Sequence, residues 1–212
     1  MKRSNWSRLT FAAAVAATVV GAVTGADRMH RLAKPLMVPA LAAGVPRMTP
    51  ALGTALAAAT IGDVLLIDPD DDRRILRGAA AFAIMQGCYS SMLISRGARP
   101  TVIEAVPRYG GWAVAATLLA RRSAAVAPGL AGYGLTLATM ATLAAAPAAA
   151  PDRGTRRRLA LGGILFTVSD GLIVWRRLFL HADAPRRYAE GAILATYAGA
   201  QLLLVEGLSR QQ

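Results

Sequence analysis

The sequence predicts an all-α polytopic membrane protein, in which eight transmembrane helices form a single integral membrane domain over residues 1–212. Of the 212 residues, 55% are hydrophobic and 17% are charged, which is more apolar than an ordinary soluble domain of this size. The apolar residues also form long runs, and short polar or charged segments separate these runs. The predicted spans are 9–24, 34–46, 49–67, 75–94, 102–120, 124–146, 159–178 and 188–208.

The first two predicted spans differ in character. We interpret 9–24 as a retained helix, with a cleaved signal peptide as the alternative, because several more spans follow it. The run 34–46 is shorter than a normal span; Pro35 suits a first helical turn, whereas Pro39 predicts a kink. A short interrupted span of this kind is expected to lie against protein rather than lipid.

Charge and proline delimit the remaining spans. The acidic turn 68–74 cannot enter hydrocarbon, so it ends the third span, and the fourth follows at once. Pro107 interrupts the fifth span, whose beginning is expected to lie at the membrane interface. The sixth, 124–146, is rich in alanine, glycine and threonine, as close helix packing requires. A Pro/Ala-rich linker and the basic cluster 153–158 then precede the last two spans.

The formal net charge of +12 indicates lipid headgroups rather than nucleic acid as the partner of the basic residues. The arginines occur as pairs and triplets beside apolar runs, where they anchor helix ends, and there is no basic face with interleaved aromatic residues. The only cysteine, Cys88, excludes an intrachain disulfide and a cysteine-based metal site. We predict no metal and no cofactor, and the sequence predicts no oligomeric state.

Two aspartates, Asp63 and Asp170, lie inside apolar runs in similar surroundings, 60–67 and 167–174. Burying a carboxylate in hydrocarbon costs roughly 3 kcal/mol, so such a residue faces the protein interior and is a candidate for function. Both lie roughly 7 to 12 Å below the same membrane surface, given about 1.5 Å of rise per residue. They are therefore expected to meet in one site, with an interhelical hydrogen-bond clamp as the structural alternative.

The spacing of these two segments also predicts a parallel duplication of two four-helix halves. The aspartates are 107 residues apart, which makes the third and seventh spans equivalent members of the two halves. The alternative is that apolar helices resemble one another by composition alone.

Further polar residues gather in the same half of the predicted bundle, and we take them as candidates for substrate binding. They are Lys34, Gln86, Tyr89, Ser169, Tyr197 and Gln201. Each also has a plainer interpretation. Lys34 can be a helix-end lysine that extends to the headgroups, Tyr89 a packing residue, and the glutamines bridges between helices.

In sequence order these residues resemble the YhhN family of membrane proteins, whose characterised members are lysoplasmalogenases. The matching motifs are Lys34-Pro35, Gly62-Asp63, the stretch from Gly78 to Tyr89, Gly163-x-x-Phe-x-x-Ser-Asp170 and Thr196-Tyr197-x-x-x-Gln201. Together they extend from the second predicted span to the eighth. One position departs from the family pattern: Gln86 replaces the histidine that often lies three residues before the tyrosine.

The resemblance implies a hydrolase that cleaves the vinyl ether bond of a lysoplasmalogen, a lysophospholipid, in a bacterial inner membrane. Vinyl ether hydrolysis needs a proton donor, a nearby negative charge and a water molecule. Two carboxyl groups in an apolar pocket share one proton and supply the first two, so Asp63 and Asp170 are the expected catalytic pair, in either order of roles. The alternatives are a transporter that uses the aspartates to couple protons, and a lipid-binding protein without activity.

Overall fold

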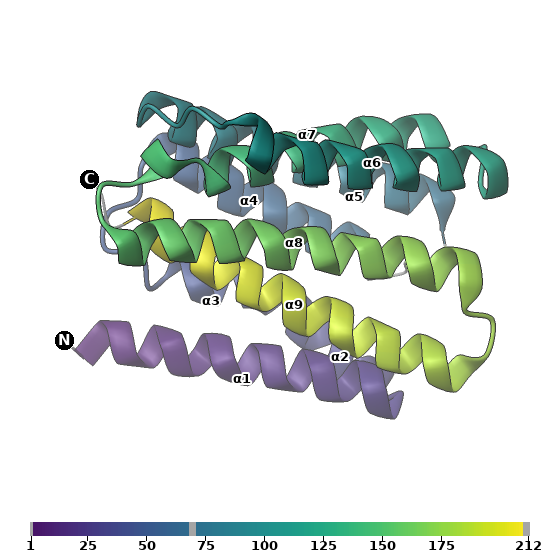
Figure 1. Ribbon diagram of the computed structural model, residues 1–212. Coiled ribbons are helices and arrows are strands. Elements are labelled where there is room, and N and C mark those ends of the chain that lie inside the picture. Colours follow the sequence, from purple (N-terminus) through teal and green to yellow (C-terminus); the bar gives the residue numbers. More distant parts are fainter. Residues whose placement is uncertain (1, 68–70, 210–212) are drawn as a thin grey trace.

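The computed structural model describes residues 2–67 and 71–209, and in these ranges the secondary structure is entirely helical. The predicted all-α class is therefore confirmed for the described part of the chain. Part of the predicted acidic turn, residues 68–70, lies outside the described residues. The α-helices are α1 (Lys2–Thr24), α2 (Asp27–Ala33), α3 (Met37–Ala42), α4 (Pro50–Leu65), α5 (Asp72–Ser95), α6 (Val102–Arg122), α7 (Ala127–Ala145), α8 (Arg153–Phe179) and α9 (Asp183–Ser209), with short 3-10 helices η1 (Lys34–Leu36) and η2 (Pro147–Ala149) (Figure 1).

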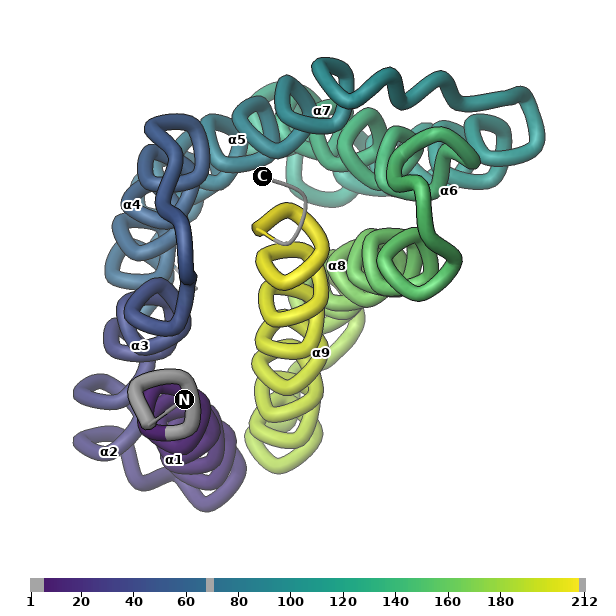
Figure 2. Tube along the Cα trace, turned by 90° about the vertical axis from the view of Figure 1, so that its left-hand side faces the viewer, coloured from purple at the N-terminus to yellow at the C-terminus, as the bar shows by residue number. Residues whose placement is uncertain are grey.

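The helices surround α9. Seen along the bundle, the chain forms an arc from α1 through α4, α5 and α7 to α6 and α8, and α9 lies inside this arc (Figure 2). The apolar window of α9 is 61% buried, against 28% for those of α1 and α8, which is consistent with a central position. Polar side chains on the inner face of α9 therefore reach the interior of the bundle.

Within the described residues, three helices are long and apolar enough to cross a membrane: Trp6–Thr24, Arg153–Phe179 and Asp183–Ser209. The helix α4 is apolar but has 16 residues, or about 24 Å at 1.5 Å per residue, against the roughly 30 Å of a hydrocarbon core. The chain is thus a helical membrane protein, while the crossing of the membrane by all eight predicted spans stays a prediction, as does the parallel duplication.

The second predicted span is the clearest departure from expectation. Residues 34–46 do not form one helix, because η1 is followed by α3, which ends at Ala42. Pro35 lies in the first turn of η1, where its missing N–H costs nothing. Lys34 is only 5% exposed, and Met37 and Val38 are 1% exposed, so this broken segment is packed against protein, as a short span requires.

Close contacts between helices depend on glycine at two positions on the helices that carry Asp63 and Asp170. A Cβ at Gly62 would lie 2.6 Å from the ring of Phe82, and one at Gly163 would lie 3.2 Å from the Cα of Ala141. Glycine therefore lets α4 approach α5, and α8 approach α7, more closely than alanine would. These contacts hold the two aspartate-bearing helices against the same interior.

Side-chain caps define where several helices begin. Asp71 Oδ1 accepts hydrogen bonds from the amides of Arg73 (2.8 Å) and Arg74 (3.1 Å) at the start of α5. Asp152 Oδ1 accepts one from the amide of Thr155 (2.8 Å) at the start of α8. Because α8 carries Asp170, the cap at Asp152 fixes where a site-bearing helix begins.

Replacing Asp152 by alanine is expected to lower the melting temperature at neutral pH. Hydrogen bonds from Thr155 hold the pKa of Asp152 below its ordinary value, so the cap stabilises the fold above the unfolded-state pKa of about 3.9. This contribution is lost as the pH falls through the lower, folded-state pKa, and the difference between wild type and variant should shrink there. Thermal unfolding of the detergent-solubilised protein across pH measures this.

Asp152→Asn is the matched control for this prediction, because asparagine caps helices about as well as aspartate and does not titrate. It should resemble the wild type at neutral pH. A loss of stability in Asp152→Ala that is the same at every pH would contradict the role given to the carboxylate.

Candidate functional site

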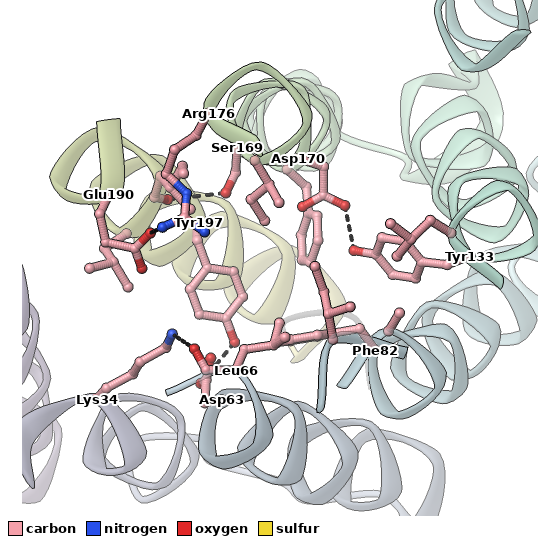
Figure 3. A pocket seen from close by; sticks show the side chains of 17 residues that line it. Lys34, Asp63, Leu66, Phe82, Tyr133, Ser169, Asp170, Arg176, Glu190 and Tyr197 are labelled. Atoms are coloured by element: carbon pink, nitrogen blue, oxygen red, sulfur yellow. Dashed lines mark hydrogen bonds and ion pairs between the residues drawn. The ribbon is translucent and has the colours of Figure 1, made fainter. Parts of the chain in front are cut away.

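A cavity of about 80 Å³ lies in the interior of the bundle, and we call it the central cavity. Its walls come from η1, α4, α5, α7, α8 and α9, so segments far apart in the sequence build it. Five of the candidate residues line it: Lys34, Asp63, Ser169, Asp170 and Tyr197 (Figure 3). Gln86, Tyr89 and Gln201 are not among the described residues that line this cavity.

Asp63 lies near the end of α4 and is only 2% exposed. The hydroxyl of Tyr197 donates a hydrogen bond to Asp63 Oδ2 (3.0 Å). Gln201 Nε2 donates in turn to the Tyr197 oxygen (3.2 Å), and the Tyr89 hydroxyl donates to Gln201 Oε1 (3.0 Å). Tyr89 and Gln201 therefore orient Tyr197 from behind, through a directed chain of hydrogen bonds that ends on the Asp63 carboxylate.

Lys34 lies next to Asp63 on the cavity wall (Figure 3). Its Nζ donates a hydrogen bond to the carbonyl oxygen of Leu66 (2.7 Å), at the C-terminal end of α4. A cation suits this position because the last carbonyls of a helix carry partial negative charge. The buried ammonium thus anchors η1 to α4 and brings a positive charge beside Asp63, in contrast to a lysine that extends to the headgroups.

Asp170 is partly buried on α8, and the hydroxyl of Tyr133 on α7 donates a hydrogen bond to its Oδ2. The neighbouring residue Ser169 is 1% exposed and donates from its hydroxyl to the carbonyl of Ile193 (3.0 Å), which ties α8 to α9. Adjacent residues of α8 therefore make different contacts: Ser169 holds the helix in place, and Asp170 carries a carboxylate into the cavity.

The two carboxyl groups line one cavity but have separate partners. Among the described residues no hydrogen bond joins Asp63 to Asp170; each is bound to its own tyrosine (Figure 3). The expected direct sharing of a proton between them is thus not the arrangement in this structure. The rings of Phe82, Phe166 and Tyr197 also line this cavity and contact one another edge to face, with centroids 5.6 to 6.3 Å apart.

Gln86, the position at which the resemblance led us to expect histidine, is fully buried on α5. Its Oε1 accepts a hydrogen bond from the hydroxyl of Thr136, while its Nε2 has no hydrogen-bond partner in the described part of the chain. Gln86 therefore bridges α5 and α7, as one of the plainer interpretations predicted.

Three polar or charged residues that the sequence did not single out also line the central cavity: Tyr133, Arg176 and Glu190. Arg176 Nη1 forms an ion pair with Glu190 Oε2 (3.2 Å), with the two side chains 6% and 15% exposed. The spacing from Ser169 to Arg176 is one heptad, which places both on one face of α8 and is the signal that could have revealed Arg176. Tyr133 lies among small residues and gives no such signal.

A second cavity, of about 280 Å³, adjoins the first, and we call it the apolar cavity. Both cavities are lined by Leu130, Tyr133, Asp170 and Ile173. The rest of its wall, from α6, α7 and α8, is mostly apolar and includes Trp112, Leu119 and Val174. Asp170 thus lies at the boundary between the central cavity and the apolar cavity.

This donor set is suited to proton transfer. It offers the carboxyl groups of Asp63 and Asp170, two tyrosine hydroxyls and the buried Lys34 around one small cavity, beside the ion pair of Arg176 and Glu190. Over residues 6–67 and 71–209 no three histidine, cysteine, aspartate or glutamate side chains are grouped so that they could hold a metal ion.

Comparison with known proteins gives the same family as the sequence motifs indicated. Searches of curated proteins and of solved structures found no match. The model of the YhhN family matches residues 29–208, which include every residue of the central cavity. Since this match covers most of the chain, the protein belongs to the YhhN family.

Proposed function

We propose that this protein is an intramembrane lysophospholipid hydrolase of the lysoplasmalogenase type. It cleaves the vinyl ether bond of a lysoplasmalogen and releases a fatty aldehyde and glycerophospho-ethanolamine or glycerophosphocholine. The observation that carries the proposal is the arrangement of Asp63 and Asp170 around one cavity, with Asp170 also lining the apolar cavity. Membership of the YhhN family supports it.

The reaction needs one proton on carbon and one water. A proton added to the alkene carbon farther from the ether oxygen leaves an oxocarbenium ion, and water then adds to the carbon bonded to oxygen while giving up a proton. The resulting hemiacetal breaks its bond to the glycerol oxygen, which takes a proton, and the aldehyde is released. The protein must therefore supply a general acid, a general base and a negative charge near the cation.

The surroundings of the two carboxyl groups suggest how they divide these roles. Each carboxyl group accepts a hydrogen bond from a tyrosine, so the difference between them is Lys34, which brings a positive charge to Asp63. Asp63 is therefore assigned as the carboxylate that stabilises the cation and accepts the proton of water. Among the described residues no cation forms an ion pair with Asp170, since Arg176 of the same cavity pairs with Glu190. Asp170 also lines the apolar cavity, where the alkenyl chain would lie. Asp170 is therefore assigned as the proton donor.

Aldehyde release by the purified wild-type protein tests the proposal. We expect aldehyde from a lysoplasmalogen, and none from the lysophospholipid with a saturated ether or an ester at the same position. In deuterated water, rapid trapping of the product should show one deuterium on the carbon next to the aldehyde group, because that carbon receives the proton. No aldehyde, or aldehyde without deuterium at that carbon, would overturn the proposal.

A further inference from the structure

A third cavity, of about 290 Å³, lies where α8 ends and α9 begins, and we call it the polar vestibule. Its wall combines residues from α1, α2, α8 and α9 with one residue that follows α4. The lining residues are Ala22, Asp27, His30, Ile67, Arg176, Asp183, Arg186, Arg187 and Glu190. Asp27, Asp183 and Arg187 are exposed, so this cavity reaches the surface of the protein.

The polar vestibule adjoins the central cavity, because the ion pair of Arg176 and Glu190 lines both. This pair is an incomplete match: Arg176 Nη1 contacts Glu190 Oε2 at 3.2 Å, whereas the buried Nε of the same guanidinium has no hydrogen-bond partner in the described part of the chain. A buried donor without a hydrogen-bond partner destabilises the fold, because it has lost its hydrogen bonds to water. It therefore marks a place where a ligand can supply the missing acceptor.

A second guanidinium, that of Arg187, packs against a glycine turn at the vestibule. Gly25 has a φ of +73°, and a Cβ at this position would lie 2.9 Å from Arg187 Nη1. The Arg187 head group therefore packs against a turn that only glycine leaves open. Arg186 is tied back in a different way, since its Nη1 donates to the carbonyl of Leu180 (3.1 Å).

The polar vestibule is lined by both positively and negatively charged side chains, and this combination indicates which class of ligand can bind there. Three arginines face three carboxylates, those of Asp27, Asp183 and Glu190. A simple anion would be repelled by the carboxylates, and a simple cation by the arginines. A zwitterion satisfies both sets, because guanidinium groups bind phosphate oxygens in a forked geometry and carboxylates bind an ammonium.

We propose that the polar vestibule binds a phosphate–amine zwitterion, with the phosphate on Arg176 and Arg187 and the amine near Asp183. Identification of this zwitterion as the substrate's glycerophospho-ethanolamine headgroup rests on the proposed function. The order of the cavities then matches the order of groups in the lipid: headgroup in the vestibule, vinyl ether in the central cavity and alkenyl chain in the apolar cavity.

The test is calorimetric binding to the purified full-length protein of three water-soluble probes: glycerophosphoethanolamine, glycerol 3-phosphate and inorganic phosphate. The first should bind most tightly, because only it carries the amine. Arg187→Gln should weaken the first two by roughly tenfold, the effect of losing one charge-assisted interaction. Asp183→Asn should weaken only glycerophosphoethanolamine and so remove its advantage over glycerol 3-phosphate.

Arg121→Gln is the matched control, since Arg121 is an exposed arginine at the end of α6 that lines none of these cavities. It should bind all three probes as the wild type does. Equal binding of all three probes by the wild type would overturn the zwitterion site and indicate a site for free phosphate. Unchanged binding in Arg187→Gln would overturn the assignment of the phosphate.

The outcomes for this site and for the proposed reaction are separable, because the probes have no vinyl ether. Binding of glycerophosphoethanolamine without any aldehyde release would support the zwitterion site and contradict the proposed hydrolase activity. Where aldehyde is released, Arg187→Gln should raise KM by roughly tenfold with kcat nearly unchanged, since Arg187 is not among the residues that line the central cavity, where the proposed reaction takes place. Aldehyde release with an unchanged KM in this variant would support the proposed hydrolase activity and contradict the binding of the headgroup in the vestibule.

Discussion

Asp170→Asn is expected to lower kcat for aldehyde release by at least about a hundredfold, within the range of 10² to 10⁴ that general acid catalysis contributes. An amide cannot deliver a proton to the alkene carbon. Its size and its oxygen are retained, however, so the hydrogen bond donated by Tyr133 can still form. The measurement is steady-state aldehyde release in detergent, with the melting temperature as a check on folding.

Tyr133→Phe is the companion variant for Asp170. It removes the donor to the Asp170 carboxyl while leaving the acid itself in place, so a smaller loss of activity, roughly tenfold, is expected. Activity of Asp170→Asn equal to that of the wild type would rule out this residue as the proton donor. A loss in Tyr133→Phe larger than that in Asp170→Asn would shift the acid role to the tyrosine.

Asp63→Asn is expected to have the second-largest effect, a loss of roughly 10² to 10³ in kcat. The neutral amide cannot balance the charge of the oxocarbenium ion, and preorganised electrostatic groups of this kind typically contribute that much. The Tyr197 hydroxyl still has an oxygen to donate to, so the cavity should keep its shape. Aldehyde release and melting temperature are again measured together, and wild-type activity in this variant would remove the two-carboxylate mechanism.

The chain of hydrogen bonds behind Asp63 provides graded controls for that variant. Tyr197→Phe removes the donor to the carboxylate, whereas Tyr89→Phe removes only the outermost bond of the chain, the one to Gln201. Activity should therefore fall more in Tyr197→Phe than in Tyr89→Phe. Equal losses in the two variants would show that these residues act through packing of the bundle and have no directed effect on the carboxylate.

Much of the site could be predicted from the sequence, for a simple energetic reason. A carboxylate in an apolar run is too costly to leave in lipid, so Asp63 and Asp170 had to face the interior wherever their helices packed. For Lys34 the sequence left an extension to the headgroups open, and the structure shows it buried. Pro35 was recognised from the sequence as suited to a first helical turn, and it lies in the first turn of η1. The cap at Asp152 was not singled out: the predicted span began at residue 159, whereas α8 begins at Arg153.

The number of membrane crossings was harder to predict from the sequence than the presence of the helices. An apolar run predicts a helix whether it faces lipid or protein, but only length separates a full span from a buried segment. Residues 34–46 illustrate this limit, since the chain there is apolar yet forms η1 and the short α3.

What the sequence by itself determined is the helical membrane class and the polar residues that must lie inside, because both follow from the cost of placing polar groups in hydrocarbon. Only the tertiary structure decided which groups meet. The pairing of Asp170 with Tyr133 and of Arg176 with Glu190, and the separation of the two aspartates, depend on the rotation and contact of helices far apart in the chain. Such contacts are fixed by side-chain packing across the whole bundle, and no local pattern encodes them.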